Sequence, residues 1–440
     1  MKISKSEFAT RRKRLMAEMT PNSVAIIPAA REVIRSRDTE YPFRQNSDFF
    51  YLTGFQEPDG ILVLIPGRRQ GQVIMFCRDR DPERELWDGY RQGPEGVVKN
   101  FGMNDAYPVS DVDDIVPGLI EGRSTIYFSM GHDDAFDRQV LGWVNSIRAK
   151  VRTGAKPPGD ISDLSFLLHE HRLIKSDAEI RVMQRAADIS AEAHGRAMRE
   201  SKPGRYEYHL ESAIQHMFAE HGARFPAYNS IVGSGKNACC LHYTENNCKM
   251  VAGDLVLIDA GCEYEGYAAD ITRTFPVAGQ FTKEQRAIYD VVLKSQLAAI
   301  AATKPGKKWN HPHDVTVKVI TQGLVDLGLL SGDVDQLIKD GAYTDFYMHR
   351  AGHWLGLDVH DVGEYRIDGK WRPLEPGMVL TIEPGIYVAA NNMNVDAKWR
   401  GIGVRIEDDV VVTKKGCHVL TSGVPKDADD IEAFMAEAYD

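Results

Sequence analysis

The sequence lacks the features that mark several specialised classes of protein. No run of eighteen apolar residues occurs, so no segment is predicted to span a membrane. The first nineteen residues are charged and helix-like, without the apolar core of a signal peptide. Long runs of Lys or Arg are missing as well, and the formal net charge is −10. This charge argues against general nucleic-acid binding, and we expect neither a nucleic-acid nor a membrane partner.

Cysteine is also scarce, with six in 440 residues and no Cys-x-x-Cys pair. Their even number would allow disulfides, and Cys239, Cys240 and Cys248 lie close enough in the chain to suggest a metal cluster. A chain of this size without a secretion signal, however, favours reduced thiols with structural roles. We therefore predict a cytoplasmic protein.

The length predicts two domains, because 440 residues exceed the usual size of a single core. We place an N-terminal α/β domain at residues 1–173, without a phosphate loop or a Gly-x-Gly-x-x-Gly motif. Short apolar runs bounded by Gly, Pro or charge predict buried strands in it. These strands are residues 24–27, 61–65, 73–76 and 125–128, and helices are expected at 8–19, 112–120 and 137–151, with a break at Pro117.

Residues 174–440 form the second predicted domain, in which long helices precede strands twice over. Ser176 and Thr282 each open a capping box, which predicts a helix that starts beside each of them. Apolar strands follow each group of helices. They are expected at 255–258 and 267–275 in the first half, and at 378–382 and 403–413 in the second. This order indicates an α+β domain of two related halves, each adding strands to one shared sheet.

The stretch from His349 to Asp361 combines three histidines with two glycines. Leu355, Leu357 and Val359 alternate with other side chains, as on a half-buried strand or an extended active-site segment. The glycines would let the backbone approach another group closely. Imidazoles beside such backbone indicate a metal or catalytic site.

Four acidic residues lie on or at the ends of apolar strands, two in each half. Asp270 follows Asp259 by 11 residues, and Glu407 follows Glu383 by 24. A carboxylate embedded in a hydrophobic strand is costly unless a cation compensates it. One such acid is often only a salt bridge, but four would neutralise two divalent ions, and a hydroxide held between the ions would be a nucleophile at neutral pH. Oxygen ligands with one imidazole favour manganese, cobalt or iron(II), and zinc stays open.

These motifs resemble those of the pita-bread metallopeptidases, which include methionine aminopeptidase, prolidase and aminopeptidase P. Residues 38–55 also resemble the amino-terminal domain of aminopeptidase P, a domain that methionine aminopeptidase usually lacks. Creatinase has the fold without the full metal set. The family commonly has small residues after the first histidine, whereas Arg350 follows His349 here, which points to altered access or substrate preference. The matching segments are Asp259-Ala260-Gly261, Asp270-Ile271-Thr272-Arg273-Thr274, His353-x-x-Gly356-x-x-x-His360-Asp361, Ile382-Glu383-Pro384-Gly385 and Arg405-Ile406-Glu407-Asp408.

The resemblance implies that two divalent metal ions, with Mn²⁺ as the first choice and Co²⁺ or Zn²⁺ as alternatives, are held by five residues. Asp270 and Glu407 would bridge the two ions. Asp259 would complete one site, and His353 and Glu383 would complete the other. A purely structural cluster of acids is the alternative, which the joint match of all five positions opposes.

Further roles follow from the same resemblance. Glu383 would pass a proton to the leaving nitrogen. His242 and His360 would hold the substrate carbonyl or stabilise the oxyanion, although His242 alone would more simply be a surface or core residue. His349 would support the substrate side of the site. Arg405 would orient a ligand or neutralise the cluster, with a plain salt bridge as the alternative.

Trp87 belongs to the first domain. A tryptophan is usually a core residue, but in proteins similar to aminopeptidase P this position reaches the active site of a neighbouring subunit. The resemblance therefore implies a homo-oligomer, a tetramer or a dimer, in which residues 1–173 serve oligomerisation and active-site access.

The function implied by the resemblance is release of the N-terminal residue from peptides with proline at the second position, with a metal-bridging hydroxide as the nucleophile. Composition and spacing alone indicate only a metal-dependent hydrolase. Prolidase, which cleaves Xaa-Pro dipeptides, is the nearest alternative. A binding protein that kept the pita-bread fold without the chemistry is another, which the intact ligand set opposes.

Overall fold

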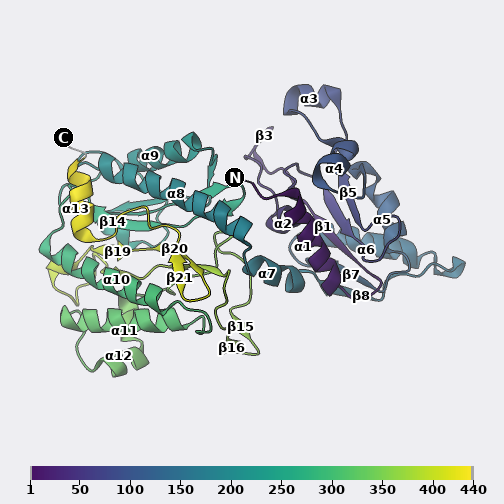
Figure 1. The fold of residues 1–440 in the computed structure, drawn as a ribbon. Coiled ribbons are helices and arrows are strands. Elements are labelled where there is room, and N and C mark those ends of the chain that lie inside the picture. Colours follow the sequence, from purple (N-terminus) through teal and green to yellow (C-terminus); the bar gives the residue numbers. More distant parts are fainter. Residues whose placement is uncertain (1, 438–440) are drawn as a thin grey trace. The chain divides into compact units, whose positions relative to one another are not determined.

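The computed structural model describes residues 2–437, which divide into two compact units at Arg172 and Leu173 (Figure 1). None of the helices in this range is long and apolar enough to cross a membrane. All six cysteines are free, as expected for reduced thiols.

A mixed six-stranded sheet forms the centre of the N-terminal unit. In spatial order its strands are β6 (Asp105–Pro108), β5 (Val73–Cys77), β4 (Ile61–Leu64), β1 (Ser23–Pro28), β7 (Thr125–Phe128) and β8 (Asp160–Asp163). β4 is antiparallel to both of its neighbours, and the other pairs are parallel. The four strands predicted from apolar runs are confirmed as the middle of the sheet. The edge strands β6 and β8 contain polar and partly exposed residues, which is why hydrophobicity did not reveal them.

The N-terminal unit also contains helices, of which α5 and α6 contribute to the core of this sheet, and the α/β class predicted for it is confirmed. They are α1 (Lys5–Glu18), α2 (Ser47–Thr53), α3 (Pro82–Asp88), α4 (Gly93–Phe101), α5 (Val112–Ile120), α6 (Asp134–Arg148) and α7 (Ser165–Leu173), and a small hairpin joins β2 (Ile34–Ser36) to β3 (Thr39–Glu40). The expected break at Pro117 is wrong, because α5 continues past it to Ile120. Proline removes one backbone hydrogen bond there. Burial of Val116 and Ile120 in the core of the sheet offsets that loss.

A buried ion pair links α2 to α7 within the N-terminal unit. Arg172 Nη1 donates to Asp48 Oδ1 at 2.7 Å, and His169 Nε2 lies 3.1 Å from Asp48 Oδ2. Burial by itself would raise the pKa of Asp48, but the hydrogen bond from His169 and the charge of Arg172 outweigh it and lower the pKa to about 2. The lowered pKa means that ionised Asp48 stabilises the folded unit.

Asp48→Asn is therefore expected to lower the free energy of unfolding of the N-terminal unit by about 2 kcal/mol at pH 7. A carboxyl group with a lowered pKa contributes stability above its unfolded pKa and loses it as the pH falls through the folded value. The difference between wild type and variant should consequently shrink between about pH 4 and pH 2. Denaturant unfolding at pH 7 and pH 3 measures it, with exposed Asp114→Asn as the control. An equal difference at both pH values would contradict the assignment.

The second unit contains two related halves, each with helices followed by strands, and confirms the α+β prediction. The first half contains α8 (Asp177–Glu200), α9 (Glu207–Glu220), β9 (Phe225–Pro226), β10 (Ile231–Ser234), β11 (Leu255–Asp259), β12 (Cys262–Tyr264), β13 (Tyr267–Ala268) and β14 (Thr272–Pro276). The second half contains α10 (Lys283–Ala302), α11 (His311–Asp326), α12 (Val334–Asp340), β15 (Arg366–Ile367), β16 (Lys370–Trp371), β17 (Val379–Ile382), β18 (Gly385–Tyr387), β19 (Gly403–Arg405), β20 (Asp408–Val412) and β21 (Cys417–Val419), followed by α13 (Ala428–Ala436). The capping boxes at Ser176 and Thr282 form as predicted.

Helices lie on both sides of the strands of this unit. Figure 1 shows α8 and α9 on one side and α10 and α11 on the other. One hydrophobic core joins the two halves, with contributions from Ile189 of α8, Ile258 of β11, Val292 of α10 and Val404 of β19. The strands at the centre are thereby held between two pairs of helices.

Two predicted strands are each broken at an acidic residue. Residues 267–275 divide into β13 and β14, with Asp270 between them, and residues 403–413 divide into β19 and β20 around Glu407. The chain changes partner at each break: β13 pairs with β12 and β14 with β11, whereas β19 pairs with β18 and β20 with β17. Both acids therefore lie where the chain passes from one small sheet to the next.

The expectation of one shared sheet is wrong for the described strands. Strand pairing gives β10-β11-β14 and β13-β12-β9 in the first half, and β17-β20-β21 and β18-β19 in the second. At the seam, the hydroxyl of Thr274 donates to the carbonyl of Arg405 at 2.9 Å and accepts from its N–H at 3.2 Å. The Thr274 hydroxyl thus takes the place of the backbone hydrogen bonds that would otherwise pair strands of the two halves. One direct backbone bond crosses nearby, from the N–H of Glu407 to the carbonyl of Thr272 at 3.0 Å.

Candidate metal centre

One pocket of the second unit, with a volume of about 950 Å³, collects the predicted site residues. It is lined by all five predicted metal ligands and by His242, His349, His360 and Arg405. Trp87 is different: it lies on α3 in the other unit with 86% of its surface exposed, and it is not a core residue. The His349–Asp361 stretch is a loop that bends at residues 356–360 and lines part of the pocket. It forms no strand, only an isolated bridge between Trp354 and Leu380.

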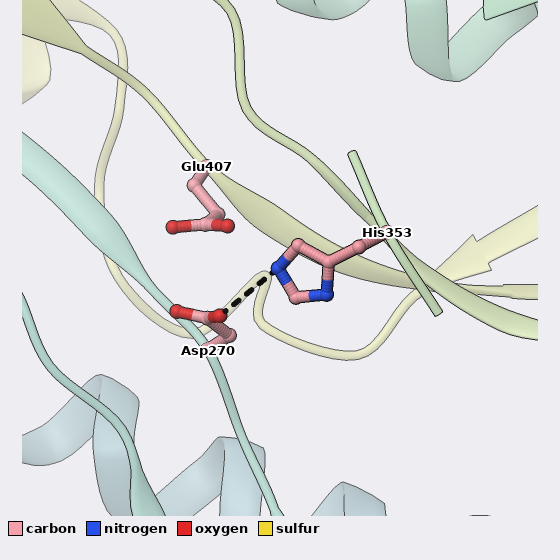
Figure 2. Close-up of side chains that lie close together, drawn as sticks. All are labelled: Asp270, His353 and Glu407. Atoms are coloured by element: carbon pink, nitrogen blue, oxygen red, sulfur yellow. Dashed lines mark ion pairs between the residues drawn. The ribbon is translucent and has the colours of Figure 1, made fainter. Parts of the chain in front are cut away.

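Three of the predicted ligands form the tightest group. One ligand atom each of Asp270, His353 and Glu407 lies within 4.8 Å of the others, and Figure 2 shows the three side chains pointing toward one another. His353 Nε2 is 3.5 Å from Asp270 Oδ2 and 3.6 Å from Glu383 Oε1. Asp270 and Glu407 come from the two strand breaks, whereas His353 comes from the loop. The site is thus assembled from both halves.

The imidazole of His353 is oriented by its own backbone. Nδ1 lies 2.9 Å from the carbonyl oxygen of Trp354, and because a carbonyl only accepts, Nδ1 carries the proton. The neutral ring then presents the lone pair of Nε2 to the acids, as a metal ligand must. Burial by itself would lower the pKa of His353, but Asp270 and Glu383 outweigh it and raise the pKa to about 9. In the metal-free protein Nε2 therefore tends to bind a second proton, and a divalent cation bound at Nε2 would take the place of that second proton.

The backbone around His353 is held by Thr381 of β17. The hydroxyl of Thr381 accepts from the N–H of His353 at 3.1 Å and lies 3.2 Å from Glu383 Oε1. Gly352 allows this approach, since a Cβ there would lie 1.9 Å from the carbonyl oxygen of Thr381. This close approach explains why residue 352 is a glycine. It brings the histidine-bearing loop against the strand that precedes Glu383.

Arg405 connects the acids to the histidine loop. Its Nη2 donates to Asp259 Oδ2 at 2.7 Å, and its Nη1 donates to the hydroxyl of Tyr387 at 3.0 Å. His349 Nε2 lies 2.9 Å from the same hydroxyl. Burial, followed by the charge of Arg405, lowers the pKa of His349 to about 4, so this imidazole is neutral at pH 7. Arg405 therefore does form the salt bridge considered above, and through Tyr387 it also positions His349.

Tyr228 is part of the site, although the sequence did not indicate it. Its hydroxyl lies 2.6 Å from Asp259 Oδ1 and 2.5 Å from Asp270 Oδ1, so that it joins the two acids of the first half. Burial and the charges of these acids raise its pKa well above the usual value, and the phenol keeps its proton. The residue follows a two-residue strand and belongs to no motif. No signal in a single sequence would have identified it.

The electrostatics of the cluster fit divalent cations. Burial, then the neighbouring carboxylates, raises the pKa of Glu407 well above its usual value. Burial is also the main reason why the pKa of Glu383 rises to about 7 and that of Asp270 is raised. Arg405 alone does not compensate four acids. Buried oxygen ligands with one imidazole are a donor set that suits hard or borderline divalent ions.

His242 and His360 stand at the more open part of the site. His360 packs edge to face against His353, with ring centroids 4.4 Å apart. Burial, followed by the charge of His353, lowers the pKa of His360. His242 follows a short helical turn, Gly235–Cys239, and is exposed to the pocket. Both rings can donate a hydrogen bond to a ligand in the pocket.

Comparison with known proteins agrees with this geometry. The profile of metallopeptidase family M24 matches residues 181–414, a range that contains all five predicted ligands, and the aminopeptidase P N-terminal domain matches residues 8–127. The chain belongs to metallopeptidase family M24. Its second unit is the pita-bread catalytic domain of that family, and Asp270, His353 and Glu407 form a possible metal site within it.

Relatives of this M24 metallopeptidase match along almost its whole length. The Xaa-Pro aminopeptidase of Escherichia coli K12 is 48% identical over 437 residues, which cover 99% of each chain. The structure of aminopeptidase PepP from Pseudomonas aeruginosa superposes with a TM-score of 0.99 at 59% identity, covering 100% of this chain and 99% of that one. A zinc-substituted E. coli aminopeptidase P in complex with product gives a TM-score of 0.97 at 48% identity, with coverage of 100% and 99%.

Proposed function

We propose that this protein is a metal-dependent aminopeptidase that releases the N-terminal residue from peptides with proline at the second position. The observation that carries the proposal is the convergence of four carboxylates and His353 in one pocket of about 950 Å³. Similarity along the full chain to Xaa-Pro aminopeptidases supports the proline preference. Proline supplies no N–H at the scissile bond, so a dedicated pocket is needed where general aminopeptidases fail.

Five residues would hold two divalent ions, with Mn²⁺ expected first and Co²⁺ or Zn²⁺ as alternatives. Asp270 and Glu407 would serve both ions, Asp259 one of them, and His353 with Glu383 the other. When bound, the ions would supply Lewis acidity toward the scissile carbonyl and would make a water molecule in the site more acidic and therefore more nucleophilic.

The protein's own residues position the substrate and move the proton. Thr381 engages Oε1 of Glu383, which leaves Oε2 to accept the proton of the attacking water and to deliver it to the proline nitrogen. His242 and His360 donate to the carbonyl oxygen as it becomes negative. Arg405 keeps Asp259 in place through its 2.7 Å bond, and neutral His349 contributes to the substrate side of the pocket.

The exposed residues of α3 and the turn after it support an oligomer. Leu86, Trp87 and Tyr90 are 86%, 86% and 91% exposed. Large apolar side chains gathered in this way commonly mark a contact with another chain. We therefore retain the proposal of a homotetramer or a dimer in which Trp87 reaches the site of a neighbouring subunit. A cytoplasmic location also stays a proposal.

The proposed activity is tested with protein stripped by chelation and reloaded separately with Mn²⁺, Co²⁺ or Zn²⁺. We expect release of alanine from Ala-Pro-Pro, at least about tenfold weaker cleavage of the dipeptide Ala-Pro, and no cleavage before reloading. Mass spectrometry of the products measures all three. Activity confined to Ala-Pro would favour a prolidase, and no hydrolysis with any ion would favour a binding protein. Glu383→Ala should retain the fold by circular dichroism and lose turnover; turnover like that of wild type would refute the role of Glu383.

A further inference from the structure

Two arginines of the pocket wall have no part in the chemistry described above. Arg350 and Arg366 both line the pocket, together with Trp371. Arg350 lies in the histidine loop, where the family commonly has small residues. Arg366 and Trp371 lie opposite each other in the β15–β16 hairpin. These three residues, called the arginine wall below, come from two segments that are both part of the second unit.

The hairpin that carries Arg366 and Trp371 has a tight turn and is anchored at its base. Its turn is Asp368-Gly369, with φ of 49° and 74°, and two positive φ values are the mark of a type I′ turn, which matches the twist of the strands. The base of the hairpin is bound to the rest of the unit, because the N–H of Trp309 donates to the carbonyl of Arg372 at 2.8 Å. Arg366 and Trp371 are therefore carried by an anchored hairpin, whereas Arg350 comes from the histidine loop.

Both guanidinium groups approach the ring of Trp371. Their central carbons lie 4.0 Å (Arg366) and 5.0 Å (Arg350) from the ring centroid. Arg350 also donates to the side-chain oxygen of Asn310. Stacking on an indole orients a guanidinium and leaves the N–H groups at its edge free to bind an oxyanion.

Within the part of the chain that the structure describes, neither arginine of the arginine wall forms a salt bridge. Among residues 2–437, no carboxylate oxygen lies within 4.0 Å of a nitrogen of Arg350 or Arg366. Asp314 is near enough for Arg350 to lower its pKa, against a larger increase from burial, but its carboxylate is bound by the amide of Asn310. Arg405, the third arginine of the pocket, is paired with Asp259.

An exposed arginine is often simply solvated, so a single one would not indicate a binding site. Here two converge on a single ring in a pocket that also contains four acids. The two bound metal ions would neutralise the four acids, whereas the arginines leave a positive charge on the pocket wall. A peptide that carries a carboxylate downstream of the scissile bond has the complementary charge.

We propose that Arg350 and Arg366, held on Trp371, form a carboxylate-binding subsite that makes the enzyme prefer peptides with a carboxylate downstream of the scissile bond. The inference rests on the proposed aminopeptidase function and specifies its substrate class. The carboxylate has two possible sources, the C-terminus of a short peptide or an acidic side chain. Arginine recognises either one through the same charge-assisted pair of hydrogen bonds.

Four peptides on the Mn²⁺-loaded enzyme separate these sources. Ala-Pro-Ala as the free acid is compared with its amide, and Ala-Pro-Glu-amide is compared with Ala-Pro-Gln-amide. We expect kcat/KM to be on the order of tenfold higher for the charged member of at least one pair, mainly through KM, and the preference to weaken at high KCl. Preference in the first pair alone identifies the C-terminus, and preference in the second identifies the side chain. Equal rates in both pairs would overturn the proposal.

Variants assign the preference to the arginine wall. In Arg350→Gln/Arg366→Gln the ratio between charged and neutral peptides should fall to about one, whereas Arg350→Lys/Arg366→Lys should retain part of it because the charge persists. The matched control is Lys370→Gln, which removes an exposed cation of the same hairpin that does not line the pocket. A ratio unchanged in the Gln double variant, or lost equally in Lys370→Gln, would contradict the assignment.

Each ratio is measured on one enzyme preparation, so a general loss of activity cancels. If wild type cleaves none of the four peptides, the aminopeptidase proposal fails. The subsite is then judged separately by isothermal titration of the same acid and amide peptides. Tighter binding of the acids that disappears in the Gln double variant would still support the arginine wall, and equal binding would refute it.

Discussion

Glu407→Gln is expected to lower kcat/KM by about a thousandfold or more, because even partners outside the ligand shell change metal affinity or activity by 10–100-fold. The same change should raise the thermal midpoint of the metal-free protein. Glutamine preserves the shape of the side chain, and its amide oxygen can still accept the 2.7 Å bond from the hydroxyl of Thr272. What it removes is an ionisable group buried among three other acids.

The opposite signs of these two effects follow from the raised pKa of Glu407. A carboxyl group whose folded pKa lies above its unfolded value destabilises the fold increasingly as the pH rises beyond the unfolded pKa. At pH 7 burial of Glu407 therefore costs the metal-free wild type free energy of folding, and the variant does not have this cost. Bound cations reverse this, since a ligand at a hundred times its Kd stabilises the fold by about 2.7 kcal/mol.

Calorimetric unfolding with and without Mn²⁺ measures both effects, alongside hydrolysis of Ala-Pro-Pro. Wild type should show a large upward shift of Tm on adding the ion, and Glu407→Gln a small one from a higher starting value. Glu375→Gln, in which the changed side chain is 53% exposed, is the control and should behave as wild type. A metal-induced shift and turnover equal to wild type in Glu407→Gln would exclude it as a ligand.

Lys175→Met is expected to destabilise the second unit by about 3–5 kcal/mol, the usual effect of removing one partner of a buried ion pair. Lys175 Nζ lies 2.8 Å from Asp361 Oδ2, and each side chain is 1% exposed. Asp361 directly follows His360, and Gly356 leaves room for the pair, since a Cβ there would lie 2.1 Å from Asp361 Oδ2. The variant should therefore also lower kcat/KM, by displacing His360.

The effect is measured by denaturant unfolding, with two comparisons. Lys175→Met/Asp361→Asn should recover part of the stability, because no buried charge then loses its partner. Lys398→Met removes a cation that is 53% exposed and lies 3.8 Å from Asp396, so it should change stability by less than about 1 kcal/mol. Equal stability of Lys175→Met and wild type would show that Asp361 does not depend on this lysine.

Much of the fold could be predicted because its signals are local. The capping boxes at Ser176 and Thr282 use residues three positions apart, and both helices start where expected. The buried strands of the N-terminal sheet can be recognised in the sequence as apolar runs. The edge strand β8 does not, because an edge strand needs no apolar side chains to pair. The break predicted at Pro117 was wrong for the opposite reason. The local preference of proline to end a helix is overridden by the burial of its neighbours.

The metal ligands could be proposed from the sequence because each occurs in a short motif, and charge counting made a divalent site plausible. The tertiary structure brings them into one pocket, and the M24 membership agrees with them. The roles of Tyr228 and Thr381 could not be predicted, because their contacts with Asp270 and His353 join segments far apart in the chain. Arg350 stood out as a departure from the family, but its partner Arg366 did not.

The sequence by itself determined the two-domain organisation that we predict, the helices with local caps, and the kinds of atom available to bind metal, since these depend on composition and short spacing. Only the tertiary structure decided which strands pair and that two of the predicted strands break at an acid. It also decided that a threonine hydroxyl replaces backbone hydrogen bonds between the halves. It also decided that two arginines share one tryptophan. These features depend on partners distant in the chain, and hydrogen bonding and packing between such partners leave no periodic trace in the sequence.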